Sequence, residues 1–198
     1  MKIIEKEKYE LAVEVLRNDG VVGYPTDTVF GLCVLFNSKQ AKQNLINKKN
    51  RPKEKSFPIM VSDVKMLCDI AKVTDDDLKI INKFMPGPLT VVLKKKDNIE
   101  DWINDGKDTF AIRIASDETL KKIIEKLNTP IFLTSANKSD FPVCKNEEEI
   151  LSYDLADLVV RGTCGYNVAS TIVDLSNNEI VILRQGPISK EDILKVIQ

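Results

Sequence analysis

The chain has 198 residues, of which 43% are hydrophobic and 30% are charged, and its net charge at pH 7 is −1. This composition is typical of an ordinary globular domain, and the near-zero charge argues against a dedicated nucleic-acid binder, whose affinity would rest on phosphate neutralisation. No apolar run approaches the ~20 residues that a membrane span needs, and the charged N-terminus lacks a signal sequence. We therefore expect a cytoplasmic protein with no membrane partner.

The sequence contains no histidine, and its four cysteines include no C-x-x-C pair. Ser-His-Asp and Cys-His catalysis and His-ligated metals are therefore excluded, and zinc or redox cysteine motifs are unsupported. The glycine patterns of Rossmann and P-loop nucleotide sites are also absent. Chemistry in this protein must use lysine, arginine, carboxylates, hydroxyls or the substrate itself, and we predict no metal site built from protein ligands.

Helix and strand patterns alternate along most of the chain. Apolar spacing and capping residues predict helices over residues 5–18 and after Ser38, Ser62, Thr74, Asp117, Asn146 and Ser189. Strands are predicted at 21–24, 57–61, 89–93, 109–114, 130–133 and 158–160, with a terminal hairpin from 169–175 and 180–183. The stretch 30–35 fits either a strand or a buried turn. These patterns predict one α/β domain over residues 1–198, with a mixed sheet and flanking helices.

Two of the predicted helices have an apolar stripe that we expect to face the core. In the first helix the stripe is Leu11, Ala12, Val15 and Leu16. In the helix after Thr74 it is Leu78, Ile81, Phe84 and Met85.

A polar elbow follows the strand at 21–24. Pro25 ends this strand, and Thr26, Asp27 and Thr28 come directly after it. In open α/β sheets, ligands bind at the ends of strands, so this elbow is a candidate binding segment. The alternative is a turn in which these side chains only satisfy their own backbone.

Basic residues are concentrated at the end of the helix after Ser38. Lys49, Arg51 and Lys53 lie there with two further lysines, and Pro52 disfavours helix at Arg51. Clustered cations beside a polar strand end suit a phosphate chain. The alternative is a solvated basic terminus that neutralises the helix dipole.

A second polar elbow contains Ser135 and Asn137, after the strand at 130–133. Strand alternation places both side chains on one side, where they can bind a phosphate, a sugar hydroxyl or a metal-bound water. The alternative is a helix cap or an Asx turn.

Arg113 lies within an otherwise apolar strand, where an arginine requires an anionic partner. That partner is either structural, such as Asp27 or Asp174, or the carboxylate of a substrate. Ser170 and Arg184 occupy the terminal hairpin, and neither is distinctive by itself.

Together these segments resemble the YrdC family, the threonylcarbamoyl-AMP synthases. The matching segments follow the family order over nearly the whole chain: 24–32, 49–52, 86–90, 111–114, 134–137, 170–174 and 183–186. Within them, the Lys-x-Arg and Ser-x-Asn pairs are the family's signature of synthase activity. The chain departs from many members by lacking a histidine after the Lys-x-Arg-Pro segment.

The resemblance implies a twisted open α/β sheet around a concave, positively charged cavity. It also implies a nucleotidyltransferase that joins L-threonine, bicarbonate or CO2 and ATP into L-threonylcarbamoyladenylate and releases pyrophosphate. Mg²⁺ would accompany the ATP. The product would feed the t6A modification of tRNA through a separate transferase complex, and direct tRNA binding is only a weak expectation.

The resemblance also implies a role for each candidate residue. ATP would be bound by Lys49, Arg51, Lys53, Ser135, Asn137 and Arg184, and threonine by Thr26, Arg113 and Ser170. Lys49 and Arg51 would in addition stabilise the transition state as catalytic residues. The alternative is a non-catalytic RNA-binding protein of the same fold, and the presence of both signature pairs favours the synthase.

Overall fold

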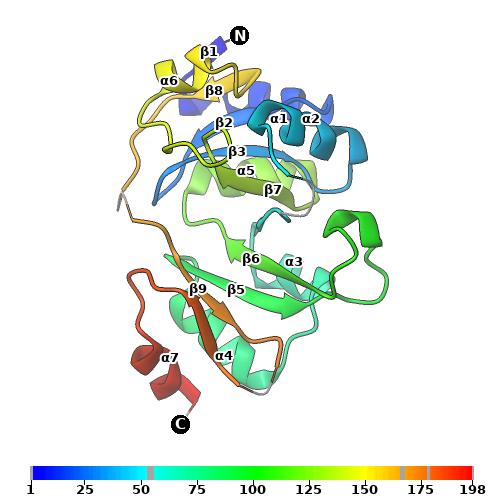
Figure 1. The fold of residues 1–198 in the computed structure, drawn as a ribbon, viewed down its shortest axis with the longest axis vertical. Coiled ribbons are helices and arrows are strands. Elements are labelled where there is room, and N and C mark those ends of the chain that lie inside the picture. The colour runs from blue at the N-terminus through cyan, green and yellow to red at the C-terminus, as the bar shows by residue number, and fades with distance from the viewer. Residues whose placement is uncertain (1, 53–55, 166–167, 178, 198) are drawn as a thin grey trace.

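The computed structural model describes residues 2–52, 56–165, 168–177 and 179–197, and these residues form one ten-stranded sheet flanked by helices (Figure 1). The strands are β1 (Lys2–Ile4), β2 (Val22–Pro25), β3 (Phe30–Leu35), β4 (Ile59–Val61), β5 (Leu89–Lys94), β6 (Thr109–Ile114), β7 (Ile131–Ser135), β8 (Leu158–Val160), β9 (Thr171–Asp174) and β10 (Val181–Arg184). The α-helices are α1 (Tyr9–Arg17), α2 (Lys39–Lys49), α3 (Val64–Ile70), α4 (Asp75–Phe84), α5 (Glu118–Leu127), α6 (Glu147–Ser152) and α7 (Lys190–Ile197). Two short 3-10 helices are η1 (Lys6–Lys8) and η2 (Asp101–Ile103).

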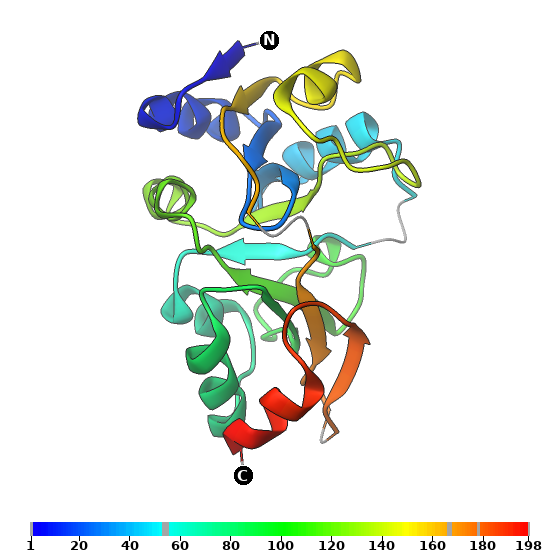
Figure 2. The same cartoon turned by 90° about the vertical axis from the view of Figure 1, so that its left-hand side faces the viewer.

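The sheet is mixed, as the sequence predicted. Its strand order is β1-β8-β2-β3-β7-β4-β6-β5-β9-β10. The pairs β1/β8, β2/β8, β4/β6 and β5/β9 are parallel, and the other neighbours are antiparallel. The two ends of the chain lie at opposite ends of the molecule (Figure 2). No helix among the described residues is long and apolar enough to cross a membrane.

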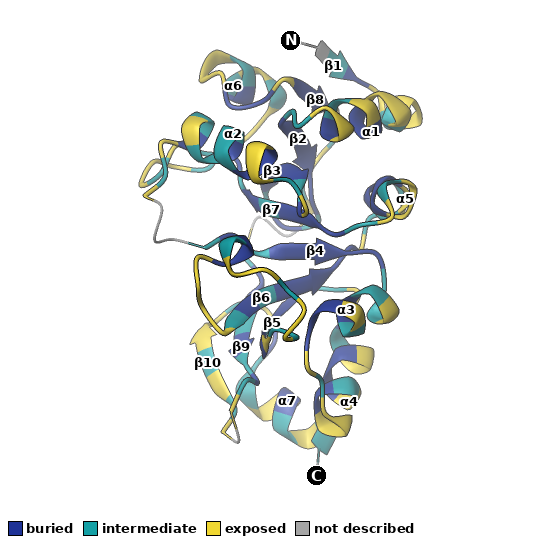
Figure 3. Cartoon of the chain, turned by 90° about the vertical axis from the view of Figure 1, so that its right-hand side faces the viewer, coloured by how far each residue is buried: buried dark blue, intermediate teal, exposed yellow. Residues whose placement is uncertain are grey.

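Side-chain alternation divides the core between the two faces of the sheet. In β3, Leu32 and Val34 join a large core cluster with α2, α3, α4, α6 and α7, whereas Cys33 joins a smaller cluster with α1 and α5. The described members of the smaller cluster include none from β5, β6, β9 or β10. On that face, α1 and α5 therefore cover only the part of the sheet that runs from β1 through β8, β2, β3 and β7 to β4. The edge strand β10 is mostly exposed (Figure 3).

Most helix starts are those that the capping residues predicted. Ser38 Oγ accepts a hydrogen bond from the Ala41 amide at 3.1 Å, and Thr74 forms a capping box at the start of α4. The prediction of Ser62 as a cap was wrong. The cap of α3 is Asp63, whose carboxylate accepts from the Met66 amide at 2.8 Å, and the Ser62 hydroxyl donates to that same carboxylate.

Two predicted apolar stripes were partly wrong. In α1 the buried residues are Ala12, Val13 and Leu16, while Leu11 is 38% exposed. The helix begins only at Tyr9, and the face that meets the sheet and α5 is the one that contains Val13. In α4, Ile80 and Ile81 are buried with Asp77, whereas Leu78 and Phe84 are half-buried.

Candidate active site

A cavity of about 580 Å³ lies over β5, β6 and β9, which α1 and α5 leave uncovered, and extends to residues of β3, β4 and β7. Val92, Ala111 and Ile172 line it and alternate along their strands with the core residues that face the opposite side. The predicted site residues that line it are Thr26, Arg51, Arg113, Ser135, Ser170 and Arg184. Among the described lining residues there is no Asp or Glu. A cavity with three arginines and several hydroxyls is suited to anionic groups.

Arg113 has a structural partner in the first elbow. Its Nη2 lies 2.5 Å from Asp27 Oδ2, its Nε donates to the Gly87 carbonyl at 2.9 Å, and its Nη1 lies 3.4 Å from Thr28 Oγ1. In the sheet, β3, β7 and β4 separate β2, which leads into this elbow, from β6. The ion pair therefore joins the two halves of the sheet beside the cavity. Of the partners that the sequence left open, the structure places Asp27 here.

The Thr26 hydroxyl is part of a local turn and is buried. It donates to the Val29 carbonyl at 2.6 Å and accepts from the amides of Thr28 and Val29 at 3.2 Å. The turn that the sequence suggested as an alternative is therefore present. Because Thr26 also lines the cavity, the turn and the binding role are compatible.

Ser170 and Arg184 meet on the opposite wall. Arg184 donates to the Ser170 carbonyl at 3.0 Å and to its hydroxyl at 3.1 Å, and Thr90 Oγ1 lies 2.8 Å from the same hydroxyl. Burial lowers the pKa of the Arg184 guanidinium. Gly186 allows this arrangement, because a Cβ there would lie 2.3 Å from the Thr171 amide nitrogen.

Lys49 contacts the second elbow and not the cavity surface. It is 1% exposed, and its ammonium donates to the Ser135 carbonyl at 2.6 Å and to the Asn137 carbonyl at 2.7 Å and Oδ1 at 3.1 Å. Burial, followed by the charge of Arg51, lowers the pKa of Lys49 to about 7. Lys49 is not among the described lining residues.

Asn137 holds together the loop after β7. Its Oδ1 accepts from the Ser135 hydroxyl at 2.7 Å, and its amide donates to the carbonyls of Lys138 and Phe141. Asn137, like Lys49, is not among the described lining residues. The structure thus brings the Lys-x-Arg and Ser-x-Asn pairs together through Lys49, and only Arg51 and Ser135 of the four reach the cavity.

The end of α2 directs Arg51 toward the cavity. Asn50 ends the helix in the left-handed conformation (φ 49°), and the Arg51 amide donates back to the Ile46 carbonyl. The guanidinium donates to the Ser56 carbonyl at 2.9 Å and lies 4.7 Å from the ring centre of Phe57. Burial lowers its pKa. Lys53, the third predicted cation of this segment, lies outside the described residues.

Four hydroxyl residues that line the cavity received no individual role from the sequence, although Thr28 lies in the first elbow: Thr28, Ser56, Thr90 and Thr134. Thr90 carries a usable signal, since it is a polar residue in an otherwise apolar strand and faces away from the core residue Val91. Its contact with Ser170 depends on the parallel pairing of β5 and β9, which the sequence did not predict.

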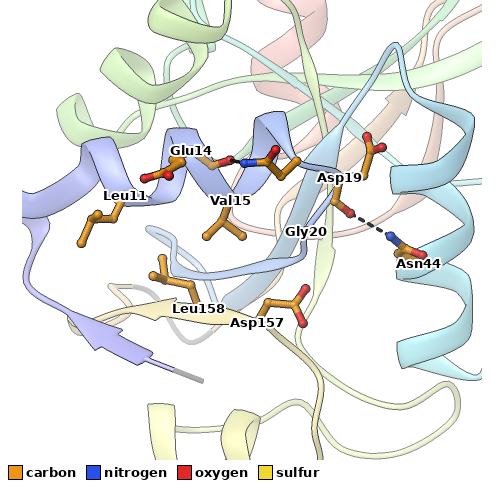
Figure 4. Close-up of a pocket in the computed structure, with 9 residues that line it drawn as sticks. Leu11, Glu14, Val15, Asp19, Gly20, Asn44, Asp157 and Leu158 are labelled. Atoms are coloured by element: carbon orange, nitrogen blue, oxygen red, sulfur yellow. Dashed lines mark hydrogen bonds between the residues drawn. The ribbon is translucent and has the colours of Figure 1, made fainter.

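A second cavity, of about 550 Å³, lies where α1, α2 and β8 meet (Figure 4). The carboxylates of Glu14, Asp19 and Asp157 line it, and its described lining contains no Lys or Arg. The Asn44 amide in it already donates to the Asp19 carbonyl at 2.9 Å. An acidic lining repels phosphates and carboxylates, so the arginine-lined cavity is the candidate active site.

No group of three or more Cys, Asp and Glu residues among the described residues is arranged to hold a metal ion. The polar side chains of the cavity are mainly hydroxyls and guanidinium groups. Guanidinium groups bind phosphate oxygens and do not ligate a metal ion, so any magnesium here would have to be held by the phosphates of a bound nucleotide.

The fold and the cavity define an α/β protein whose cavity is suited to small molecules with anionic groups. The family model described as "Telomere recombination" (Sua5, YciO and YrdC) matches residues 14–186. The chain is 30% identical over 187 residues to the threonylcarbamoyl-AMP synthase of Vibrio parahaemolyticus, covering 91% of this chain and 100% of that protein. The chain belongs to the Sua5/YciO/YrdC family.

A longer relative has a solved structure. The chain is 32% identical over 198 residues to the threonylcarbamoyl-AMP synthase of Pyrococcus abyssi, covering 98% of this chain but only 58% of that protein. The crystal structure of Pyrococcus abyssi Sua5 complexed with L-threonine matches with a TM-score of 0.91 at 30% identity, covering 100% of this chain and 61% of that one. The family fold therefore extends over all of the present chain.

Proposed function

We propose that this protein synthesises L-threonylcarbamoyladenylate from L-threonine, bicarbonate or CO2, and ATP, with release of pyrophosphate. The observation that carries the proposal is the cavity, in which Arg51, Arg113 and Arg184 meet the hydroxyls of Thr26 and Ser170. The names of the relatives and the threonine complex of one of them support the same reaction. The proposal requires one site that holds a triphosphate and an amino acid together.

The reaction needs charge neutralisation more than a protein base. The threonine amine adds to CO2 and loses a proton, which gives a carbamate. A carbamate oxygen then attacks the α-phosphorus of ATP, so that a new P–O bond forms and the bond to pyrophosphate breaks. In-line positioning and neutralisation of the phosphate charge account for most of the catalysis in such transfers. This suits a chain that contains no histidine.

The positions of the side chains suggest how the work is divided. Arg51 binds the triphosphate and stabilises the developing charge, and Arg184 binds the nucleotide from the opposite wall. Arg113, held by Asp27, pairs with the threonine carboxylate, next to Thr26 and Ser170.

Lys49 and Asn137 do not line the cavity, so their proposed roles are indirect. Lys49 acts from behind the second elbow, where its hydrogen bonds hold Ser135 and Asn137 in place. Ser135 then contacts the nucleotide, and Asn137 does so only if its present contacts are exchanged for ATP. Lys53 remains a proposed ATP ligand.

The proposal also includes the metal ion, the carbon source and the macromolecules that would use the product. ATP would bring Mg²⁺, which would neutralise part of the phosphate charge, while the protein supplies guanidinium and hydroxyl groups around the nucleotide. Bicarbonate is the source of the carbamate carbon. A transferase complex that modifies tRNA takes up the product, direct tRNA contact is weak, and the protein works in the cytoplasm.

The test is pyrophosphate release from MgATP and bicarbonate, first without and then with L-threonine. We expect release that depends on threonine, and a loss of about 100-fold in kcat/KM in Arg51→Ala, the size typical of a lost transition-state contact. Arg17→Ala is the matched control, because this exposed arginine lies on α1 away from the cavity. Release without threonine dependence, in a folded protein that binds ATP, would refute the synthase. RNA binding that persists at moderate salt would then favour the RNA-binding alternative.

A further inference from the structure

A second buried lysine, Lys42, lies two turns before Lys49 on α2. It is 5% exposed, and its ammonium donates to the carbonyls of Trp102 at 2.7 Å and Ile103 at 3.1 Å and to Asp105 Oδ1 at 2.7 Å. These three acceptors match the three hydrogens of the ammonium group. Lys42 therefore fixes the backbone that runs from η2 to Asp105.

A chain of hydrogen bonds links this backbone to Arg51. Asn104 lies between the residues that Lys42 binds, and its carbonyl accepts from the Ser56 hydroxyl at 3.2 Å. The carbonyl of Ser56 accepts in turn from Arg51 Nη2 at 2.9 Å. The segment that Lys42 holds thus supports the residue on which the guanidinium rests.

A chain of aromatic contacts connects the same two residues. The Lys42 ammonium lies 5.8 Å from the ring centre of Phe132, and this ring is 6.1 Å from that of Phe57. The guanidinium carbon of Arg51 lies 4.7 Å from the ring centre of Phe57. Polar and aromatic contacts therefore both lead from Lys42 to Arg51.

We propose that Lys42 is a positioning residue that sets the place of Arg51 for binding the ATP phosphates. This inference rests on the proposed function, which puts Arg51 at those phosphates. A buried charge is an inefficient means of stabilising a core, since apolar residues of similar volume often do so equally well. The structure gives Lys42 a more specific task, because it holds one short segment and that segment contacts Arg51.

The test compares Lys42→Met with Lys39→Met by calorimetric titration of each protein with MgATP. Lys39 is exposed on the same helix and faces the Trp102 ring, so its variant is the matched control. We expect MgATP to bind Lys42→Met about 10-fold more weakly, as is typical of a displaced phosphate ligand, and to bind the control as it binds the wild type. This readout does not require the synthase reaction, so the proposed function and this inference can fail separately.

Two further measurements separate positioning from loss of structure. In the synthase assay, the KM for ATP should rise while the KM for threonine stays constant, whereas partial unfolding would lower only the apparent kcat. In an Arg51→Ala background, Lys42→Met should have no further effect on ATP affinity. Additive effects of the two substitutions, or unchanged ATP affinity in Lys42→Met, would overturn the proposal.

Discussion

The buried ammonium of Lys49 makes the stability of this protein depend on pH. Burial and the charge of Arg51 lower the pKa of Lys49 from 10.5 to about 7. Between these two values the unfolded chain binds more protons than the folded one, so the free energy of unfolding rises with pH. Below about pH 7 both states are protonated and the effect ends. The two pKa values give a gain of about 1.6 kcal/mol between about pH 7 and about pH 8.5.

The measurement is urea unfolding of the wild type and of Lys49→Met at several pH values. Burial raises the pKa of two thiols, that of Cys33 to about 12 and that of Cys144. When the pH rises above the ordinary thiol pKa, the unfolded chain loses these protons first, so the free energy of unfolding falls. Both proteins share the Cys33 thiol, so its contribution cancels in the difference. The Lys49 charge acts on the pKa of Cys144, so the comparison is restricted to below about pH 8.5, where burial keeps this thiol protonated in the folded protein.

We expect the unfolding free energy of the wild type to rise relative to that of Lys49→Met by about 1.6 kcal/mol from about pH 7 to about pH 8.5. Between about pH 5.5 and about pH 6.5 the difference should stay constant. Parallel curves over the whole range would refute the reasoning. They would mean that the three oxygens around the Lys49 ammonium favour the charged form as strongly as burial disfavours it.

Two further predictions concern the walls of the cavity. Asp27→Asn leaves Arg113 without its carboxylate, so the unfolding free energy should fall by about 2 kcal/mol and the KM for threonine should rise while that for ATP stays constant. Glu5→Gln, which breaks an exposed ion pair with Arg161, is the control, and an unchanged KM for threonine in Asp27→Asn would contradict the prediction. Gly186→Ala should lower the unfolding free energy by about 3 kcal/mol and weaken ATP binding, because its Cβ would lie 2.6 Å from the Ala169 carbonyl oxygen and push on the backbone next to Arg184. An unchanged melting temperature would show that the hairpin adapts at no cost.

The fold class and most elements were readable from the sequence, because their signals are local. The strand at residues 109–114 has the bounds that its alternation predicted. Caps such as Ser38 and Asp117 were also predicted, since a side chain that accepts from an amide three residues on acts within one turn. The wrong cap at Ser62 lay one residue from the true one, where the sequence offers two adjacent candidates.

The partners of the charged side chains were decided only by the tertiary structure. The sequence indicated that Arg113 needs an anion but left several partners open, and the tertiary structure places Asp27 beside it. It grouped Lys49 with Arg51, yet the packing of α2 directs Lys49 into the second elbow and Arg51 into the cavity. Nothing in the sequence singled out Lys42.

One physical reason explains which features were predictable from the sequence and which were not. Helix caps, strand alternation and apolar stripes depend on residues a few positions apart, so the sequence specifies them directly. The partner that a buried charged side chain contacts depends on which distant strands become neighbours, and the strand order is a property of the whole sheet. The sequence therefore predicted which residues are candidates for the site, and the tertiary structure decided which of them line the cavity and which contact those residues from behind.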